Sequence, residues 1–202
     1  MLLGPKYKIC KRLGASVFEK CQTQKFQLAE ARAPRKTKGR RGGSDFGAQL
    51  LEKQKARFTY GLSESQFSRY VHEAMEKKGK DSVSGLLTRL ESRLDNVIYR
   101  AGFVKTRRAA RQMVSHGHVL VNGRRVNVPS FKVEKGMVVS IRPESRGSAL
   151  YTNRTEAMAE TKAPEWMKFD DQGFAVKVEA NPGLGEGEAP FNAPVIIQFY
   201  SR

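Results

Sequence analysis

Hydrophobic side chains recur at helical spacing after residue 43 and predict two helices in the first half of the chain. The first begins after Ser44, a residue type that favours helix starts, and ends at Gly61. The second begins at the sequence SESQ, residues 63–66, which is a capping-box pattern, and ends at Gly79. The first helix carries three basic residues that we expect on its outer side: Lys53, Lys55 and Arg57.

Two more helices are predicted before the pattern changes. Apolar residues from Leu86 to Ile98 lie on one helical face, which indicates a single helix that Gly102 ends. A shorter helix begins after Thr106, whose hydroxyl can accept a hydrogen bond from the first turn, and ends at Gly117.

The spacing of apolar residues then becomes alternating, which is typical of strands. Residues 118–128, HVLVNGRRVNV, form two short segments around Asn122-Gly123, a pair that favours a type I′ hairpin turn. A further strand, preceded by a Lys-Gly turn, is predicted through Ile141. Residues 86–143 are therefore expected to form two helices packed on a small antiparallel sheet. Alternation places four valines on one face of the hairpin: Val119, Val121, Val126 and Val128.

The signals weaken after Pro143. A helix is predicted at 149–161, and three apolar runs, WMKFD, FAVKVEA and PVIIQFYS, are interpreted as short strands. The predicted fold class is α+β, with a mostly helical domain and a module of helices on a small antiparallel β-sheet. Four segments are expected: a basic N-terminal arm at 1–43, a helical domain at 44–90, the module at 91–154, and a C-terminal segment at 155–202 that packs back on the helical domain.

The charge of the chain narrows the choice of partner. Its 202 residues carry a net charge of +17, which favours nucleic acid and, next, an anionic membrane surface. No apolar run approaches the roughly 18–20 residues of a membrane span, and the first residues lack the apolar core of a secretory signal.

The positive charge is concentrated in two segments. Residues 86–146 hold 13 basic residues against 4 acidic ones, and residues 1–43 hold 12 against 2. The segment 1–43 lacks sustained periodicity, and its Gly/Pro-punctuated basic run ARAPRKTKGRRGG, residues 31–43, predicts an arm that becomes ordered only on a polyanion. The alternative is a solvated, disordered tail. Arg40 and Arg41 of this arm are expected to contact RNA. The same is expected of the three basic residues on the first predicted helix, Lys53, Lys55 and Arg57.

The stretch VKTRRAARQMVSHGHVLVNGRRV, residues 104–126, has the features of a phosphate-binding surface. Arg107 and Arg111 share one helical face, beside the positive end of the helix that Thr106 caps. The hairpin turn adds two more arginines, and the alternative is a solvated charged face without a ligand. Ten residues are candidate RNA contacts: Thr106, Arg107, Arg108, Arg111, Gln112, His116, His118, Asn122, Arg124 and Arg125.

A metal site is not indicated. His116 and His118 have no Cys, Asp or Glu near them in sequence, and Cys10 and Cys21 are not spaced like a common zinc pair. We expect no metal and no other cofactor. Two cysteines do not make a disulfide framework, so a reducing cytosol is the expected environment.

An enzyme is not predicted either, because the chain has no G-x-S-x-G, Walker or G-x-G-x-x-G motif. The tripeptide Arg93-Leu94-Asp95 is similar to one that carries the catalytic aspartate of RNA pseudouridine synthases. The remaining chain is too short and irregular for their catalytic domain. Asp95, expected in the middle of a helix, is therefore assigned a structural hydrogen bond or ion pair, with Arg93 or Arg100 as the candidate partner.

The residues LLTRLESRLDNVIYRAGFVKTRRAARQMVSHGHVLVNGRRVNVPSFKVEKGMVVSIR closely resemble the RNA-binding module named after small-subunit ribosomal protein S-four. Pseudouridine synthases, tyrosyl-tRNA synthetases and a heat-shock ribosome-binding protein also contain this module. The flanking sequences GPKYKICKR, KGRRGGSDFGAQLLEKQKARFTYGLSESQFSRYVHEA and PEWMKFD…VIIQFYSR resemble the ribosomal protein family itself, of bacterial or organellar type. A standalone RNA-handling or RNA-modifying factor is the alternative.

The resemblance implies a primary binder of small-subunit ribosomal RNA that docks on a multi-helix junction of the 5′ domain early in assembly. It also implies contact with ribosomal protein S-five and neighbouring small-subunit proteins, a place near the channel through which mRNA enters, and an influence on decoding accuracy. The expected location is the small ribosomal subunit, in the cytoplasm or an organellar matrix.

Two features of the chain depart from the family pattern. Many relatives carry four N-terminal cysteines that can bind zinc, whereas only Cys10 and Cys21 are present here. Residues 170–194 are rich in Gly, Pro and acid where relatives are usually more basic.

Overall fold

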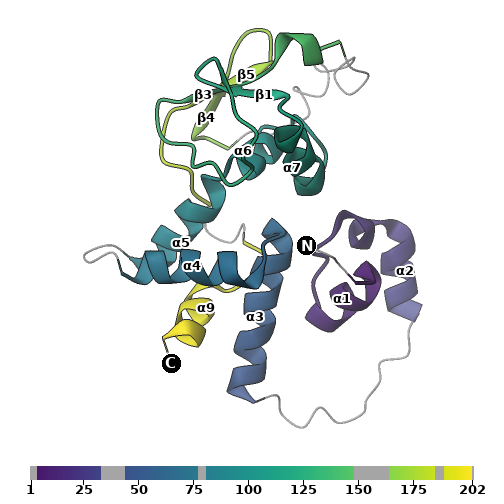
Figure 1. Ribbon diagram of the computed structural model, residues 1–202. Coiled ribbons are helices and arrows are strands. Elements are labelled where there is room, and N and C mark those ends of the chain that lie inside the picture. The colour runs from purple at the N-terminus through teal and green to yellow at the C-terminus, as the bar shows by residue number, and fades with distance from the viewer. Residues whose placement is uncertain (1–3, 33–43, 77–80, 148–163, 185–188, 202) are drawn as a thin grey trace. The chain divides into compact units, whose positions relative to one another are not determined.

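The chain forms two compact units, shown in Figure 1. One unit comprises Met1–Leu86 and Gly185–Arg202, and the other comprises Leu87–Leu184. The computed structural model describes residues 4–32, 44–76, 81–147, 164–184 and 189–201. The fold class is α+β, as predicted. Arg40, Arg41, Gly79 and the helix predicted at 149–161 lie outside the described residues.

The two helices predicted in the first half of the chain are confirmed as α3 (Asp45–Tyr60) and α4 (Glu64–Met75). The Ser44 hydroxyl accepts a hydrogen bond from the Gly47 amide at 3.3 Å, which satisfies one of the amides that a helix start leaves without a partner. Ser63 caps α4 in the same way through the Gln66 amide, also at 3.3 Å.

The last apolar run, predicted to be a strand, is instead the helix α9 (Ala193–Tyr200), which lies beside α3 and α4 in Figure 1. A run of apolar residues this short fits either a strand or a buried helix, so periodicity alone could not decide. The decisive features are local: the Asn192 side chain accepts from the Val195 amide at 3.3 Å, and Pro194 occupies the first turn. Ala193 and Ile196, three residues apart, are both buried.

The N-terminal segment is also more ordered than predicted. It contains α1 (Lys6–Leu13), the 3₁₀ helix η1 (Glu19–Gln22) and α2 (Gln24–Arg32). The weak periodicity of this segment does not exclude helices, because residues 4–32 enclose a small apolar core of their own. Almost all of the basic run at 31–43, on which the prediction of an arm was based, lies outside the described residues. Four buried residues form this core: Cys10, Phe18, Cys21 and Phe26.

Cys10 and Cys21 are joined by a disulfide, although their spacing predicts no disulfide framework. α1 ends at Gly14 in a left-handed conformation, and η1 follows within a few residues, so the two thiols meet. Phe58 of α3 packs against the same core, with its ring centroid 6.0 Å from that of Phe18.

The second unit begins with two helices where one was predicted: α5 (Ser82–Glu91), which starts in the first unit, and α6 (Leu94–Arg100). Arg93 is extended and forms an isolated antiparallel bridge with Lys132. The Ser92 carbonyl accepts from the Val133 amide at 2.7 Å. The apolar periodicity continues through this break, which is why the sequence does not show it.

The other elements among the described residues of this unit are the helix α7 (Arg107–Ser115), the short η2 (Pro143–Ser145) and a five-stranded sheet. The strands are β1 (Val119–Val121), β2 (Arg124–Arg125), β3 (Val138–Ile141), β4 (Met167–Phe169) and β5 (Ala175–Val178). Their order is β2-β1-β3-β5-β4, and all pairs are antiparallel. Asn122 and Gly123 both have positive φ, so the predicted hairpin is confirmed.

Strands β4 and β5 confirm two of the three predicted C-terminal strands, but they complete the sheet of the second unit. The expectation that the segment 155–202 packs back on the helical domain is therefore wrong for part of it. Among its described residues, 164–184 belong to the second unit and 189–201 to the first. Residues 164–178 pair with the module because β3 offers an open edge to β5, with Val139 opposite Val176.

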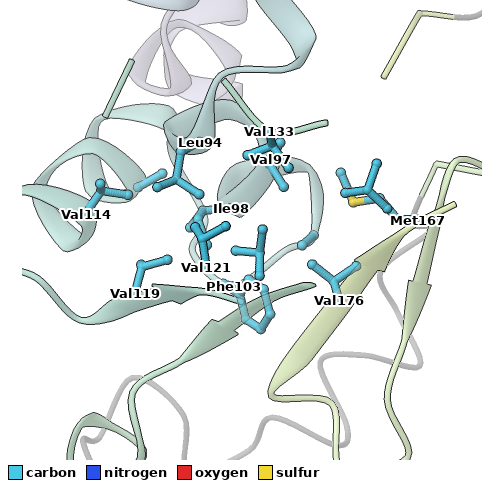
Figure 2. Packing of buried hydrophobic residues seen from close by; sticks show 14 of the residues in the cluster. Leu94, Val97, Ile98, Phe103, Val114, Val119, Val121, Val133, Met167 and Val176 are labelled. Carbon is cyan, nitrogen blue, oxygen red and sulfur yellow. The ribbon is translucent and has the colours of Figure 1, made fainter. Parts of the chain in front are cut away.

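Figure 2 shows the core between α6 and the sheet, where Val97 and Ile98 face Val121 and Val176. The prediction for the four hairpin valines is only partly confirmed. Val119 and Val121 are buried and Val126 is half-buried, but Val128 is 50% exposed because the chain leaves the sheet after β2.

Reducing the Cys10–Cys21 bond is expected to destabilise the N-terminal helices by about 2–3 kcal/mol, because the crosslink restricts the unfolded chain. Hydrogen exchange of the α1 amides with and without reductant measures this directly. In a Cys10→Ser/Cys21→Ser variant, the α1 amides should exchange as fast as those of the reduced wild-type protein, with or without reductant. Equal α1 exchange in the oxidised and reduced wild-type protein would contradict the prediction.

Candidate nucleic-acid interface

α7 presents its capped start at the surface of the second unit. The Thr106 hydroxyl accepts from the Ala109 amide at 3.0 Å, so the predicted cap is confirmed. Ala110, Met113 and Val114 are buried and fix the helix against the core. The first turn contains no acidic residue, so its positive dipole end is not neutralised within the helix.

Arg107 and Arg111 share one face of α7, as predicted, but that face is turned toward α6. The Arg107 Nε donates to the Asn96 Oδ1 at 2.8 Å, and the guanidinium lies 4.3 Å from the centroid of the Tyr99 ring. Arg111 donates from Nε and Nη2 to the Oδ2 of Asp95, at 3.1 and 2.9 Å. Both arginines are therefore held by the protein and only partly exposed.

Asp95 is the centre of a buried charge cluster. Its carboxylate also accepts from the Arg93 Nε at 3.0 Å and from the Arg93 Nη2 at 2.8 Å. The predicted ion pair with Arg93 is thus confirmed, whereas Arg100 binds Glu91, at 2.9 Å. The expected position in the middle of a helix is wrong, because Asp95 lies in the first turn of α6.

Arg108 and Gln112 are exposed along α7, and His116 is exposed just after its last residue. Both arginines of β2 are exposed at the hairpin. The Arg125 Nη2 donates to the His116 carbonyl at 3.3 Å, which ties the hairpin to the end of α7. Gly117 lies beneath this guanidinium with a φ of 74°, and a side chain there would collide with Arg125. The structure therefore brings together the end of α7 and the hairpin.

His118 and Asn122 have structural partners. A ring nitrogen of His118, Nδ1, lies 2.9 Å from the Ser145 hydroxyl, and the Asn122 side-chain oxygen accepts from the Val138 amide at 2.8 Å. These bonds fix η2 and β3 relative to the hairpin. Among the described residues, no group of three or more His, Cys, Asp and Glu side chains is arranged to hold a metal ion.

The sequence predicts that the three basic residues of α3 lie on its outer side, and this prediction is wrong. Lys53 is only 7% exposed and its ammonium lies 2.6 Å from the Glu64 carboxylate, which also accepts from Arg57 at 3.1 Å. Lys55 pairs with Glu52 at 2.6 Å. These pairings hold the three side chains against the protein. The sequence does not show the pairing of Lys53 and Arg57, because their partner Glu64 lies on the next helix, α4.

Sequence reasoning also missed the residues that hold the α7 arginines, namely Asn96 and Tyr99, and it missed Arg111 as a partner of Asp95. Only one signal pointed there: Asp95 is the last acidic residue before Glu134 in a strongly basic stretch. A lone carboxylate among arginines is expected to be paired.

Two family models match this chain, and together they cover most of it. Residues 1–91 match the ribosomal protein S4/S9 N-terminal domain, and residues 92–139 match the S4 domain. The small ribosomal subunit protein uS4 of Roseiflexus castenholzii is 44% identical, over 99% of this chain and 98% of its own length. The chain belongs to the uS4 family.

Other members of the family give the same result. The uS4 proteins of Persephonella marina and Chloroflexus aurantiacus are 43% and 40% identical, and each alignment covers 98% or more of both chains. The uS4 family consists of ribosomal proteins and not of enzymes, so the chain is a non-enzymatic protein with an S4 RNA-binding domain. Within the described residues, no helix is both long and apolar enough to span a membrane.

A Gly117→Ala substitution is expected to destabilise the second unit and to displace Arg125. A left-handed alanine costs about 1–2 kcal/mol. The added methyl also displaces the flexible end of Arg125 and so breaks its bond to the His116 carbonyl. Gly123→Ala is the matched control, because Gly123 has a similar φ of 78° but nothing within 4 Å of an added side chain. Urea unfolding should show the larger loss for Gly117→Ala. Equal losses would show that the packing of Arg125 on Gly117 has no energetic weight.

The ion pairs of Glu64 with Lys53 and Arg57 should make the stability of the first, helical unit depend on pH. Burial raises the pKa of Glu64, but hydrogen bonds from Lys53 and Tyr200 and the nearby positive charges outweigh this and hold the pKa below its ordinary value. A lowered folded-state pKa contributes stability above the unfolded pKa, and that contribution is lost as pH falls through the folded value.

Glu64→Gln should therefore lower the melting temperature by a few degrees at most near pH 7, since the carboxylate is partly exposed, and by less near pH 3. Glu73→Gln removes an exposed i,i+4 pair with Arg69 and is the control, expected to change little at either pH. Thermal melts at both pH values are the measurement. A pH-independent effect of Glu64→Gln would be inconsistent with the linkage.

Proposed function

We propose that this chain is a structural component of the small ribosomal subunit that binds its RNA directly and early, at a multi-helix junction of the 5′ domain. Membership of the uS4 family supports the ribosomal role. The geometry of α7 and the hairpin supports RNA as the ligand. The observation that carries the proposal is the set of exposed arginines on this rigid surface: Arg108, Arg124 and Arg125.

The sequence surrounding these arginines contains no competing acid. Between Asp95 and Glu134 there is no Asp or Glu, and the side chain of Asp95 is only 6% exposed and paired internally. A surface of this kind neutralises closely spaced phosphates and releases their counterions, so its affinity depends on salt concentration. Arginine suits the task, because its planar guanidinium can make two parallel bonds to one phosphate.

The backbone around these arginines is fixed by capping, by the hairpin and by the sheet, which is what recognition of RNA shape requires. Structured RNA is read mainly through its backbone and 2′-hydroxyls, so the distances between protein charges must match the distances between phosphates. The bond from Arg125 to the His116 carbonyl helps to set this spacing, since it ties the hairpin to the end of α7.

The finer expectations belong to the same proposal and rest on the family resemblance. They are contact with ribosomal protein S-five and neighbouring proteins, a position near the path of incoming mRNA, and an influence on decoding accuracy. The proposed location is the small subunit in the cytoplasm or an organellar matrix. The predicted RNA contacts of Arg40, Arg41, Lys55 and Arg57 remain predictions, and the burial of Lys53 argues against a contact there.

An Arg108→Ala/Arg124→Ala variant should bind 5′-domain ribosomal RNA about tenfold or more weakly, because two phosphate contacts are removed. The slope of log affinity against log salt concentration should become shallower by about 2. Binding is measured by filter retention or fluorescence anisotropy over a range of salt concentrations.

Lys177→Ala is the control for loss of one positive charge away from this face. Lys177 is exposed on β5, three strand spacings from β2, or about 14 Å, which exceeds the screening length at physiological salt. Its loss should leave the affinity and the salt slope nearly unchanged. An equal loss in both variants would indicate non-specific attraction, and unchanged binding of the double arginine variant would exclude this face.

A further inference from the structure

We propose that Asp95 is a positioning residue for RNA binding: its buried carboxylate orients the guanidinium of Arg111 so that a phosphate meets an arginine already in place. The inference rests on the proposed function and deepens it. It assigns a role in RNA recognition to a negatively charged, buried residue that does not itself face the ligand.

The geometry of the cluster separates an inner arginine from an outer one. Arg93 and Arg111 both donate two hydrogen bonds to the carboxylate of Asp95. The side chain of Arg93 is 2% exposed, whereas that of Arg111 is 35% exposed. Arg111 is therefore the member of the cluster through which the charge reaches the surface of α7.

The charges of the cluster do not cancel. Among these three residues, two guanidinium groups and one carboxylate leave one net positive charge, and the buried Arg93 pairs with the Asp95 carboxylate from within the protein. Arg111 thus keeps its attraction for a phosphate although it is paired with a carboxylate. This distinguishes the arrangement from an ordinary ion pair, in which the partner's charge weakens the field.

Stability alone does not account for a buried cluster of three charges. Desolvating charged groups is unfavourable, and replacing a buried ionic triad by apolar residues is often neutral or stabilising. Glu91 and Arg100 form a second ion pair in which the carboxylate is fully buried, so α6 does not depend on Asp95 alone for polar anchoring. A role at the surface supplies a reason for the cluster that packing does not.

The contact with Asp95 fixes the orientation of the Arg111 guanidinium as well as its position. Because the guanidinium is planar, two bonds from its Nε and Nη2 determine the direction of the whole group. A long side chain that is already ordered loses less conformational freedom when a phosphate binds. Arg107 is held in a comparable way, with its Nε on the buried Asn96 and its guanidinium on the Tyr99 ring.

One substitution tests the inference directly, because electrostatics and positioning predict opposite changes in RNA affinity. Asp95→Asn removes a negative charge beneath an RNA-binding surface, so electrostatics alone predicts tighter binding. Positioning predicts the opposite. We expect the full-length variant to bind 5′-domain RNA about five- to tenfold more weakly, with a salt slope shallower by about 1. Affinity equal to or above that of wild type, with an unchanged slope, would overturn the inference.

Asp95→Asn leaves Arg93 without its carboxylate and can lower stability, so a second pair of variants keeps the test independent of folding. Arg111→Lys retains the charge and the Asp95–Arg93 pair but loses the planar two-bond contact. Arg108→Lys makes the same change at an exposed position of α7. We expect the loss of affinity at 111 to approach that of Asp95→Asn and the loss at 108 to be about twofold or less. Equal losses at 111 and 108 would overturn the inference.

Combining Asp95→Asn with Arg111→Lys distinguishes a positioning role of Asp95 from a merely structural one. If Asp95 acts through Arg111, the Asp95→Asn/Arg111→Lys variant should bind no more weakly than the weaker single variant. Additive losses would overturn the inference. If the wild-type protein does not bind 5′-domain RNA, or binds it without salt dependence, the proposed function itself has failed. Full affinity of the Arg108→Ala/Arg124→Ala variant excludes only this face.

Discussion

The second unit depends on the place where the backbone of residues 92–95 meets that of residues 129–133. Three hydrogen bonds of 2.7–3.1 Å join them, from Val133 to Ser92, from Leu94 to Phe131 and from Asp95 to Pro129. A buried amide or carbonyl without a partner is strongly unfavourable, so this pairing lets a helix stop and restart inside a core. It separates α5 from α6 and places Asp95 in the first turn of α6, facing α7.

Scaffold and surface are consequently not separate parts of this unit. The Arg93–Asp95–Arg111 cluster belongs to the interior at one end and to the face of α7 at the other. Arg125 joins the hairpin to α7 in a comparable way, through the His116 carbonyl and the space left by Gly117. Arginines that the sequence shows simply as positive charges thus differ physically. Arg108 is exposed, Arg111 is clamped, and Arg93 is buried.

Features set by neighbouring residues could be predicted from the sequence, and features set by distant residues could not. The Thr106 cap and the Asn122-Gly123 turn depend on one or two side chains each, and both are confirmed. The break at Arg93 depends on a segment some forty residues away, and the burial of Lys53 depends on Glu64 and α9. At the candidate site, composition identified the basic surface. It could not rank the arginines, because their carboxylate and aromatic partners come from another helix.

The helical unit is assembled from two stretches of chain, whereas the module is one uninterrupted stretch. A ribosome releases the amino end first, so all five strands of the sheet have been made before α9. Until then, the surfaces of α3 and α4 that α9 covers, including the Phe67 ring near Tyr200, have no partner. The two units therefore complete their folds in a fixed order during synthesis. The module can mature during synthesis, and the helical unit closes only when residues 193–200 arrive.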